Sequence, residues 1–127
     1  MNCPKCGGAR LGPLGTSEGV TLDFCPDCRG LLFDPGELAE TFELEKDFPD
    51  LRAVRAEARR SGITCPACGT GWVELPWQAG TDLVLDLCPG CGLVWLDKGE
   101  FPKLEALAAG LDSPSSRLLR AVKTVER

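Results

Sequence analysis

Eight cysteines are the residues of this 127-residue chain best suited to chemistry, and all of them occur in Cys-x-x-Cys pairs. They are Cys3, Cys6, Cys25, Cys28, Cys65, Cys68, Cys88 and Cys91. Two cysteines separated by two residues can bring both sulfurs to one metal ion, and Zn²⁺ takes four such ligands in a tetrahedron. Because the chain has no histidine, a closed site must consist of thiolates alone. We therefore expect two zinc ions per chain, each held by four cysteines.

The spacing of the pairs indicates which cysteines share an ion. Between Cys6 and Cys25 lie 18 residues, and between Cys68 and Cys88 lie 19. Closing such a loop costs less entropy than a pairing across the two halves of the chain. Four thiolates leave no position for water or substrate, so the sites are expected to be structural. Two alternatives stay open, namely disulfides or redox dithiols, and mononuclear iron in place of zinc.

The second half of the chain repeats the first. "FCPDCRGLLFDPGEL" at residues 24–38 returns as "LCPGCGLVWLDKGEF" at residues 87–101, with a Cys-x-x-Cys pair and an Asp-x-Gly-Glu in each. Units of roughly 60 residues bury too little apolar surface to be stable without a further stabilising element such as a bound metal ion. The repeat therefore predicts two small tandem units, each organised around its own zinc.

The segments around the cysteines predict the elements that position them. Apolar and polar residues alternate at 20–24 and 73–78, and 83–87 reads as a partner strand, so each loop between cysteine pairs is expected to be an antiparallel hairpin. After each second pair, "DPGELAETFELEK" and "DKGEFPKLEALAAG" have helical spacing. The expected fold class is small α+β and metal-stabilised, with two tandem zinc β-ribbons each followed by a helix.

The Asp-x-Gly-Glu segments have the form of a helix capping box. Asp34 is expected to accept a hydrogen bond from the backbone N–H of Glu37, with Pro35 at the first helical position, and Asp97 and Glu100 repeat the arrangement. Two other interpretations are a carboxylate near the metal and an acid–base pair for catalysis.

Both halves resemble the bacterial zinc-finger domain classed with the zinc ribbon of transcription factor IIB. That family has the pattern CPxCxG, a hairpin and CPxCxGxWLDxGEL, which the chain matches over residues 3–38 and 65–101. The resemblance implies zinc binding by the eight cysteines and, by analogy of fold, a role related to transcription. The family's tryptophan is present as Trp95 but replaced by Leu32, and its second glycine is present as Gly30 but replaced by Leu93.

The rest of the chain is expected to be helical. Leu51, Val54 and Ala58 fall on one face of a helix that would join the ribbons and stop at Gly62, and the tail places apolar and basic residues on opposite faces. The expected organisation is a first ribbon with its helix at 1–45, a helical linker at 46–62, a second ribbon with its helix at 63–110, and an amphipathic helix at 111–127.

Charge and composition limit location and partners. The formal net charge is −5; eight thiolates remove eight units and two zinc ions return four, which gives −9. Such a chain is expected to disfavour nucleic-acid backbones, although arginines are concentrated at 52–60 and 117–127. The chain lacks an apolar signal segment and a run long enough to cross a bilayer, so we expect it in the cytoplasm with no membrane association.

The expected function is a non-catalytic adaptor or regulatory module that contacts another protein. A protein partner or a second copy of the chain is expected to bind through the second ribbon and the tail, with Trp77 and Trp95 as aromatic anchors. Trp72 and Trp77 can instead belong to the hairpin core. The alternative is a nucleic-acid-binding regulator that uses the arginine-rich helices, and a thiol redox enzyme comes third because no open metal site or histidine base is found.

Overall fold

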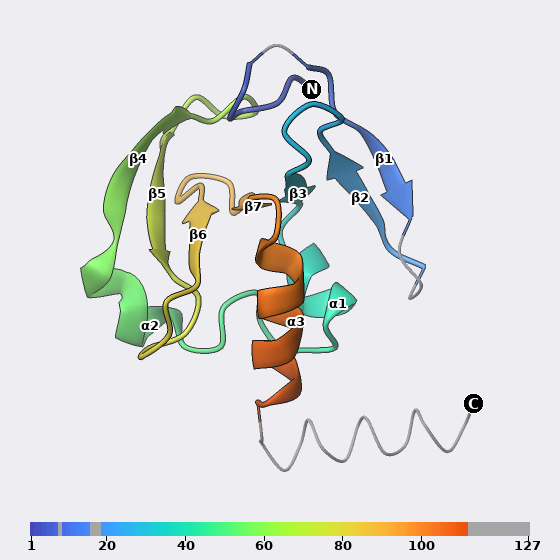
Figure 1. Ribbon diagram of the computed structural model, residues 1–127. Helices are drawn as coiled ribbons and strands as arrows, with labels where there is room; N and C mark the ends of the chain where they lie inside the picture. Colours follow the sequence, from blue (N-terminus) through green and yellow to red (C-terminus); the bar gives the residue numbers. More distant parts are fainter. Residues whose placement is uncertain (8, 16–18, 112–127) are drawn as a thin grey trace.

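The structure is a computed structural model that describes residues 1–7, 9–15 and 19–111 (Figure 1). These residues form one antiparallel sheet of seven strands in the order β1-β2-β3-β7-β6-β5-β4. The elements are β1 (Gly12–Gly15), β2 (Thr21–Phe24), β3 (Leu31–Phe33), α1 (Glu37–Thr41), α2 (Leu51–Val54), the 3₁₀ turn η1 (Arg55–Glu57), β4 (Arg59–Thr64), β5 (Gly71–Pro76), β6 (Val84–Leu87), β7 (Val94–Leu96) and α3 (Glu100–Ala109). The prediction of a small α+β fold with two four-cysteine groups is confirmed.

The hairpins expected between the cysteine pairs are present. In the first half β1 pairs with β2, and in the second half β5 pairs with β6. Each hairpin returns the chain to the point where the first cysteine pair left it. The alternation of apolar and polar residues was therefore a valid signal for these strands.

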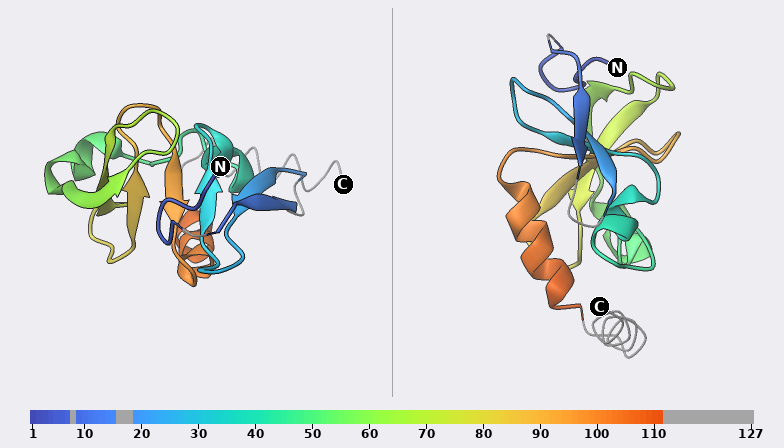
Figure 2. Two further views of the ribbon diagram at one scale, coloured as in Figure 1. Left: turned by 90° about the horizontal axis from the view of Figure 1, so that it is seen from above. Right: turned by 90° about the vertical axis from the view of Figure 1, so that its right-hand side faces the viewer.

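The two halves are joined at the centre of the sheet, which the sequence did not lead us to expect. Strands β3 and β7 pair antiparallel, with Leu32 opposite Trp95, and they are flanked by the hairpins of the two halves (Figure 2). Leu32 and Trp95 occupy equivalent positions of the repeat, so the junction relates the halves by an approximate two-fold axis. The ribbons are thus two parts of one sheet.

Alternation along β3 and β7 divides the buried side chains between two faces. Phe33, Val94 and Leu96 belong to the larger core, which also includes Leu38 of α1 and Leu104 of α3. Leu32 and Trp95 point to the other face, where they join a smaller cluster that contains cysteines of both groups. One face of the sheet therefore carries the helices and the other carries the metal ligands.

The linker departs from the predicted helix. Helix α2 ends at Val54, η1 adds a single turn, and Arg59–Thr64 is strand β4 at the edge of the sheet. Val54 is buried, but Leu51 is 41% exposed, so the predicted apolar face is not buried as a whole. The helix prediction is wrong beyond η1 because pairing with β5 gives this segment backbone partners that local propensity could not foresee. The proposed division at residues 45, 62 and 110 stays a prediction, and the tail helix lies outside the described residues.

The capping-box prediction is correct for the glutamate and wrong for the aspartate. The residues before α1 and α3 are Gly36 and Gly99, with φ of 87° and 88°, so neither N-cap residue has a side chain to cap its helix. At α1 the Asp47 carboxylate takes that role and accepts from the N–H groups of Gly36 at 2.8 Å and Ala39 at 2.9 Å. The glutamate does reach back, because the Asp34 N–H donates to Glu37 Oε1 at 2.6 Å, as in the second half. The aspartate contributes only its backbone carbonyl, which accepts from the Glu37 N–H at 2.9 Å. Asp-x-Gly-Glu is therefore a tight turn whose third residue needs a left-handed backbone, and Pro35 lies before the helix.

None of the helices in the described part of the chain combines the length and the apolar character that a membrane span requires.

Candidate metal centres

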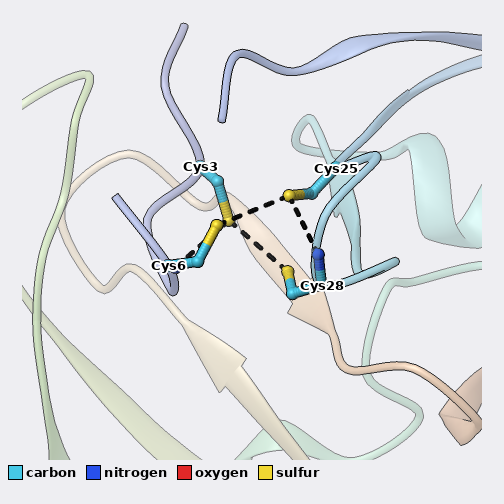
Figure 3. A group of neighbouring side chains, drawn as sticks. All are labelled: Cys3, Cys6, Cys25 and Cys28. Carbon is cyan, nitrogen blue, oxygen red and sulfur yellow. Dashed lines mark hydrogen bonds between the residues drawn. The ribbon is translucent and has the colours of Figure 1, made fainter. Parts of the chain in front are cut away.

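The first four-cysteine group consists of two loops that face each other (Figure 3). Cys3 and Cys6 lie in the N-terminal loop, and Cys25 and Cys28 follow β2. The sulfurs of Cys3 and Cys28 are 3.6 Å apart, as are those of Cys6 and Cys25. Sulfurs placed 2.3 Å from a tetrahedral zinc would be about 3.8 Å apart, whereas a disulfide would require about 2.05 Å. The spacing fits a metal ion.

The second group repeats this geometry. Cys65 and Cys91 have sulfurs 3.6 Å apart, and the sulfurs of Cys68 and Cys88 are 3.5 Å apart. Within each group all four sulfurs lie within 4.8 Å of one another. The first and third cysteines of each group are buried, so the ion would be shielded on its inner side. The donor set fits zinc, and the prediction of two zinc ions per chain is confirmed.

Backbone amides prepare the sulfurs to bind as thiolates. The N–H of Cys28 donates to the sulfur of Cys25 at 3.4 Å, and the N–H of Cys91 donates to that of Cys88 at 3.5 Å. Burial raises the pKa of Cys25, but the amides of Cys28 and Asp27 and neighbouring thiols outweigh it and bring the pKa to about 7. Such donors hold the sulfur in position and favour its charged form.

Trp72 adds a side-chain donor in the second group. Burial raises the pKa of Cys65, but a hydrogen bond from Trp72 and the amides of Cys68 and Ala67 lower it to about 6. The Trp72 Nε1 is buried and has no hydrogen-bond partner of ordinary geometry among the described residues. Its lowering effect on the pKa of Cys65 places the indole N–H close to that sulfur.

The two metal centres share one cluster of buried side chains. It contains two cysteines from each group together with Ala9, Leu32, Trp72, Leu93 and Trp95. Trp95 is completely buried, and its ring lies on Gly30 of the first half. A Cβ at Gly30 would be 2.1 Å from Cζ2 of Trp95. The first half thus keeps the glycine of the repeat and the second half keeps the tryptophan because these two residues pack against each other.

A charged contact also crosses between the halves. The Lys5 ammonium, in the first cysteine loop, is 2.8 Å from Asp86 Oδ2 and 3.5 Å from Asp97 Oδ2. Asp97 Oδ1 accepts from the Trp95 indole N–H at 2.9 Å. The Asp86 side chain is only 5% exposed, and burial raises its pKa, although Lys5 opposes this. The contact is asymmetric, because the residue equivalent to Lys5 in the second half is Ala67.

The tryptophans proposed as exposed interface anchors are buried. Trp77 and Trp95 are both 0% exposed, and Trp72 is 1% exposed. The Trp77 indole N–H donates to the backbone carbonyl of Asp47 at 2.8 Å and so ties the linker to the second hairpin. The expectation that Trp72 and Trp77 belong to the core is confirmed, and the anchor expectation for Trp77 and Trp95 is wrong.

Comparison with known families agrees with the geometry. Residues 2–43 match the family described as transcription factor zinc-finger, of the transcription factor IIB zinc-ribbon type. Residues 2–43 are therefore similar to a zinc ribbon of this family. The second four-cysteine group, at residues 65–91, suggests a second copy. No curated protein and no solved structure matched the chain significantly.

Sequence reasoning missed the contacts between the two ribbons. The signal for one of them was present, because Gly30 and Leu32 of the first ribbon are exchanged for Leu93 and Trp95 in the second. A glycine kept in one copy and a large ring kept in the other indicate that the copies pack together. No comparable signal singled out Lys5 or Asp86.

Proposed function

We propose that this protein is a non-catalytic adaptor or regulatory module in which two zinc ribbons form a single platform that contacts another protein. The observation that carries the proposal is the construction of the sites. Each group offers four thiolates, so a bound zinc has no open position, and both groups are built into the buried cluster that joins the ribbons. Metal in such a place supports the fold, and activity has to come from the surface.

The family is consistent with this proposal. Zinc ribbons of this type are typically non-catalytic. A role in transcription is part of this proposal and rests on the family description alone. The thiolate ligands require a reducing compartment, which supports a cytoplasmic location.

The experiment compares the zinc-loaded chain with the same chain after a chelator has removed the zinc. The full chain is immobilised, and proteins from the native host are captured and quantified by mass spectrometry, with and without nuclease. A partner retained after nuclease, in fixed ratio to the chain and lost when chelator removes the zinc, supports the proposal. The captured partner must then bind the purified chain directly. A second copy of the chain also counts as a partner.

Two results would overturn it. Material captured only through nucleic acid would favour the alternative of a nucleic-acid-binding regulator. Turnover of a thiol or disulfide substrate by the zinc-loaded chain would favour an enzyme.

A further inference from the structure

The two metal centres have the same ligands but different neighbours. Each group consists of four cysteines, of which the first and third are buried and the second is exposed. Backbone N–H groups donate to cysteine sulfurs in both groups at 3.4 to 3.5 Å. Ligand type, burial and backbone donors therefore do not distinguish the centres, and a difference in metal affinity has to come from the side chains around them.

A hydroxyl lies against the second group and has no counterpart in the first. Thr70 Oγ1 is 3.2 Å from the sulfur of Cys68. The equivalent position of the first ribbon, two residues after Cys6, is Gly8, which has no side chain to donate. Once Cys68 binds zinc as a thiolate its sulfur can only accept, so the Thr70 hydroxyl becomes the donor of this hydrogen bond.

The second ribbon also makes room for that hydroxyl. A Cβ at Gly90 would be 2.4 Å from Thr70 Oγ1 and 3.1 Å from the sulfur of Cys68. Gly90 thus allows the hydroxyl to lie between the two cysteine loops. The equivalent residue of the first ribbon is Asp27, so the first ribbon lacks both the hydroxyl and the glycine that accommodates it.

Trp72 supplies a second side-chain donor to the same group. Its indole is 1% exposed, its Nε1 has no partner of ordinary geometry in the described part of the chain, and its N–H lies close to the sulfur of Cys65. A buried N–H that has lost its water needs an acceptor, and a charged thiolate is a better one than a neutral thiol. The equivalent position of the first ribbon is Arg10, whose side chain is exposed.

Strand pairing holds the second group more firmly as well. Its first cysteine loop is bounded by β4 and β5, which pair at Thr64 and Gly71 just outside the loop (Figure 1). The matching loop of the first ribbon is closed by the isolated bridge between Asn2 and Arg10. A loop between two paired strands needs more free energy to open than a loop closed by one bridge.

Charged residues favour the first centre, but only weakly. Four thiolates and one zinc ion leave a negative charge, and the first ribbon carries Lys5, Arg10 and Arg29 near its cysteines. The Lys5 ammonium is already paired with Asp86 Oδ2 at 2.8 Å. Arg10 and Arg29 are exposed, so water and salt screen them. Thr70 and Trp72, in contrast, act on the sulfurs directly.

We propose that Thr70 and Trp72 make the second centre the tighter zinc site, so that the first ribbon releases its zinc first and takes it up last. Hydrogen bonds to the sulfurs stabilise their negative charge and fix their positions, and loss of such a partner typically weakens metal binding by about 10- to 100-fold. When zinc is limiting, the chain then holds one ion, in the second ribbon. The inference goes beyond the adaptor function and does not depend on it, because it concerns the order in which the two centres fill.

The test removes zinc stepwise from the full two-zinc chain with increasing concentrations of a chelator. Native mass spectrometry counts the remaining ions, and iodoacetamide followed by peptide mass spectrometry shows which cysteines have been freed. In the natural chain, the first group should react at chelator concentrations about tenfold lower than the second. This group consists of Cys3, Cys6, Cys25 and Cys28.

Three variants separate hydrogen bonding from shape. Thr70→Val keeps the shape of the side chain without the hydroxyl, and the second group should then lose zinc at about tenfold lower chelator concentration. Thr70→Ser restores a hydroxyl and should keep the natural order. Trp72→Phe keeps an aromatic ring without the N–H and should act like Thr70→Val. The matched control is Thr64→Val, at an exposed threonine of β4, which should leave the order unchanged.

Three outcomes would overturn the inference. Simultaneous release from both groups of the natural chain would show that the centres are equal. Earlier release from the second group would show that the charges around the first centre decide the order. Equal effects of Thr70→Val and Thr70→Ser would show that the hydroxyl plays no part. Failure of the adaptor proposal would be seen in partner capture and would leave these measurements unaffected.

Discussion

Replacing Gly30 by alanine tests the packing of the first ribbon against the second. The added Cβ would lie 2.1 Å from Cζ2 of Trp95, 2.6 Å from Cε2 and 3.0 Å from Cη2. Ordinary contact begins near 3.4 Å, so the ring or the backbone must move by about 1.3 Å. The backbone of Gly30 is outside the left-handed region, which means that any loss of stability comes from this contact and not from the dihedral angles of alanine.

The ring has little freedom to give way. Trp95 is 0% exposed, and its Nε1 is held by Asp97 Oδ1 at 2.9 Å. Overpacking of a well-packed core costs roughly 1–3 kcal/mol, and the depth of this overlap argues for the upper end, about 3 kcal/mol. For a domain of this size that corresponds to a fall in Tm of roughly 10 °C.

The assay is thermal unfolding of the zinc-loaded chain at one fixed excess of zinc, because bound metal itself raises Tm. Gly12→Ala is the matched control, since nothing lies within 4 Å of a Cβ there and its backbone is also outside the left-handed region. In a Trp95→Leu background, Gly30→Ala should cost little, giving a coupling energy of about 2 kcal/mol or more. Equal stability of the two alanine variants, or an undiminished cost without the tryptophan, would refute the reasoning.

Further predictions concern metal, charge and pH. Native mass spectrometry should find two zinc ions per chain, and a chelator should unfold the chain because site energies of roughly 10–16 kcal/mol dominate folding; one ion per chain would contradict this. Lys5→Met leaves a buried carboxylate unpaired and should destabilise by about 3 kcal/mol in denaturant unfolding, whereas Lys98→Met at an exposed position should change little. Asp97→Ala removes the acceptor of an indole N–H and should lower the free energy of unfolding by about 1 kcal/mol. Asp34→Ala should lower it less, and both variants should keep two zinc ions. An equal loss of stability in the two variants, or a missing zinc ion in either, would disprove this. Burial raises the pKa of Glu100 to about 7, so its contribution to stability is present below its unfolded value of 4.5 and is lost as pH rises through 7. Tm should therefore fall between about pH 4.5 and pH 7 and level off above it, and Glu100→Gln should flatten that slope; an unchanged slope would show that another group titrates.

The sequence alone was enough for the chemistry of the metal centres and for the hairpins that serve them. A Cys-x-x-Cys pair and a loop of 18 or 19 residues are local features, and local geometry decides where the sulfurs can go. Alternation likewise predicted β2 and β5, and residues 83–87 were read as the partner strand, which is β6. The Asp-x-Gly-Glu segment was harder to predict, since a capping box and a tight turn both place an aspartate and a glutamate three residues apart.

Only the tertiary structure decided how the two ribbons are joined. Strands β3 and β7 are short and apolar, and nothing in their pattern shows whether they are edges or partners until Leu32 is found opposite Trp95. Segment 59–64 became a strand because β5 offered an unpaired edge, which overrides a weak helical preference. Lys5 acquired its role in the same way, since its carboxylate partners come from the second ribbon. These contacts depend on surfaces that exist only after each ribbon has folded, so the sequence points to them only where the two copies differ, at Gly30 and Trp95.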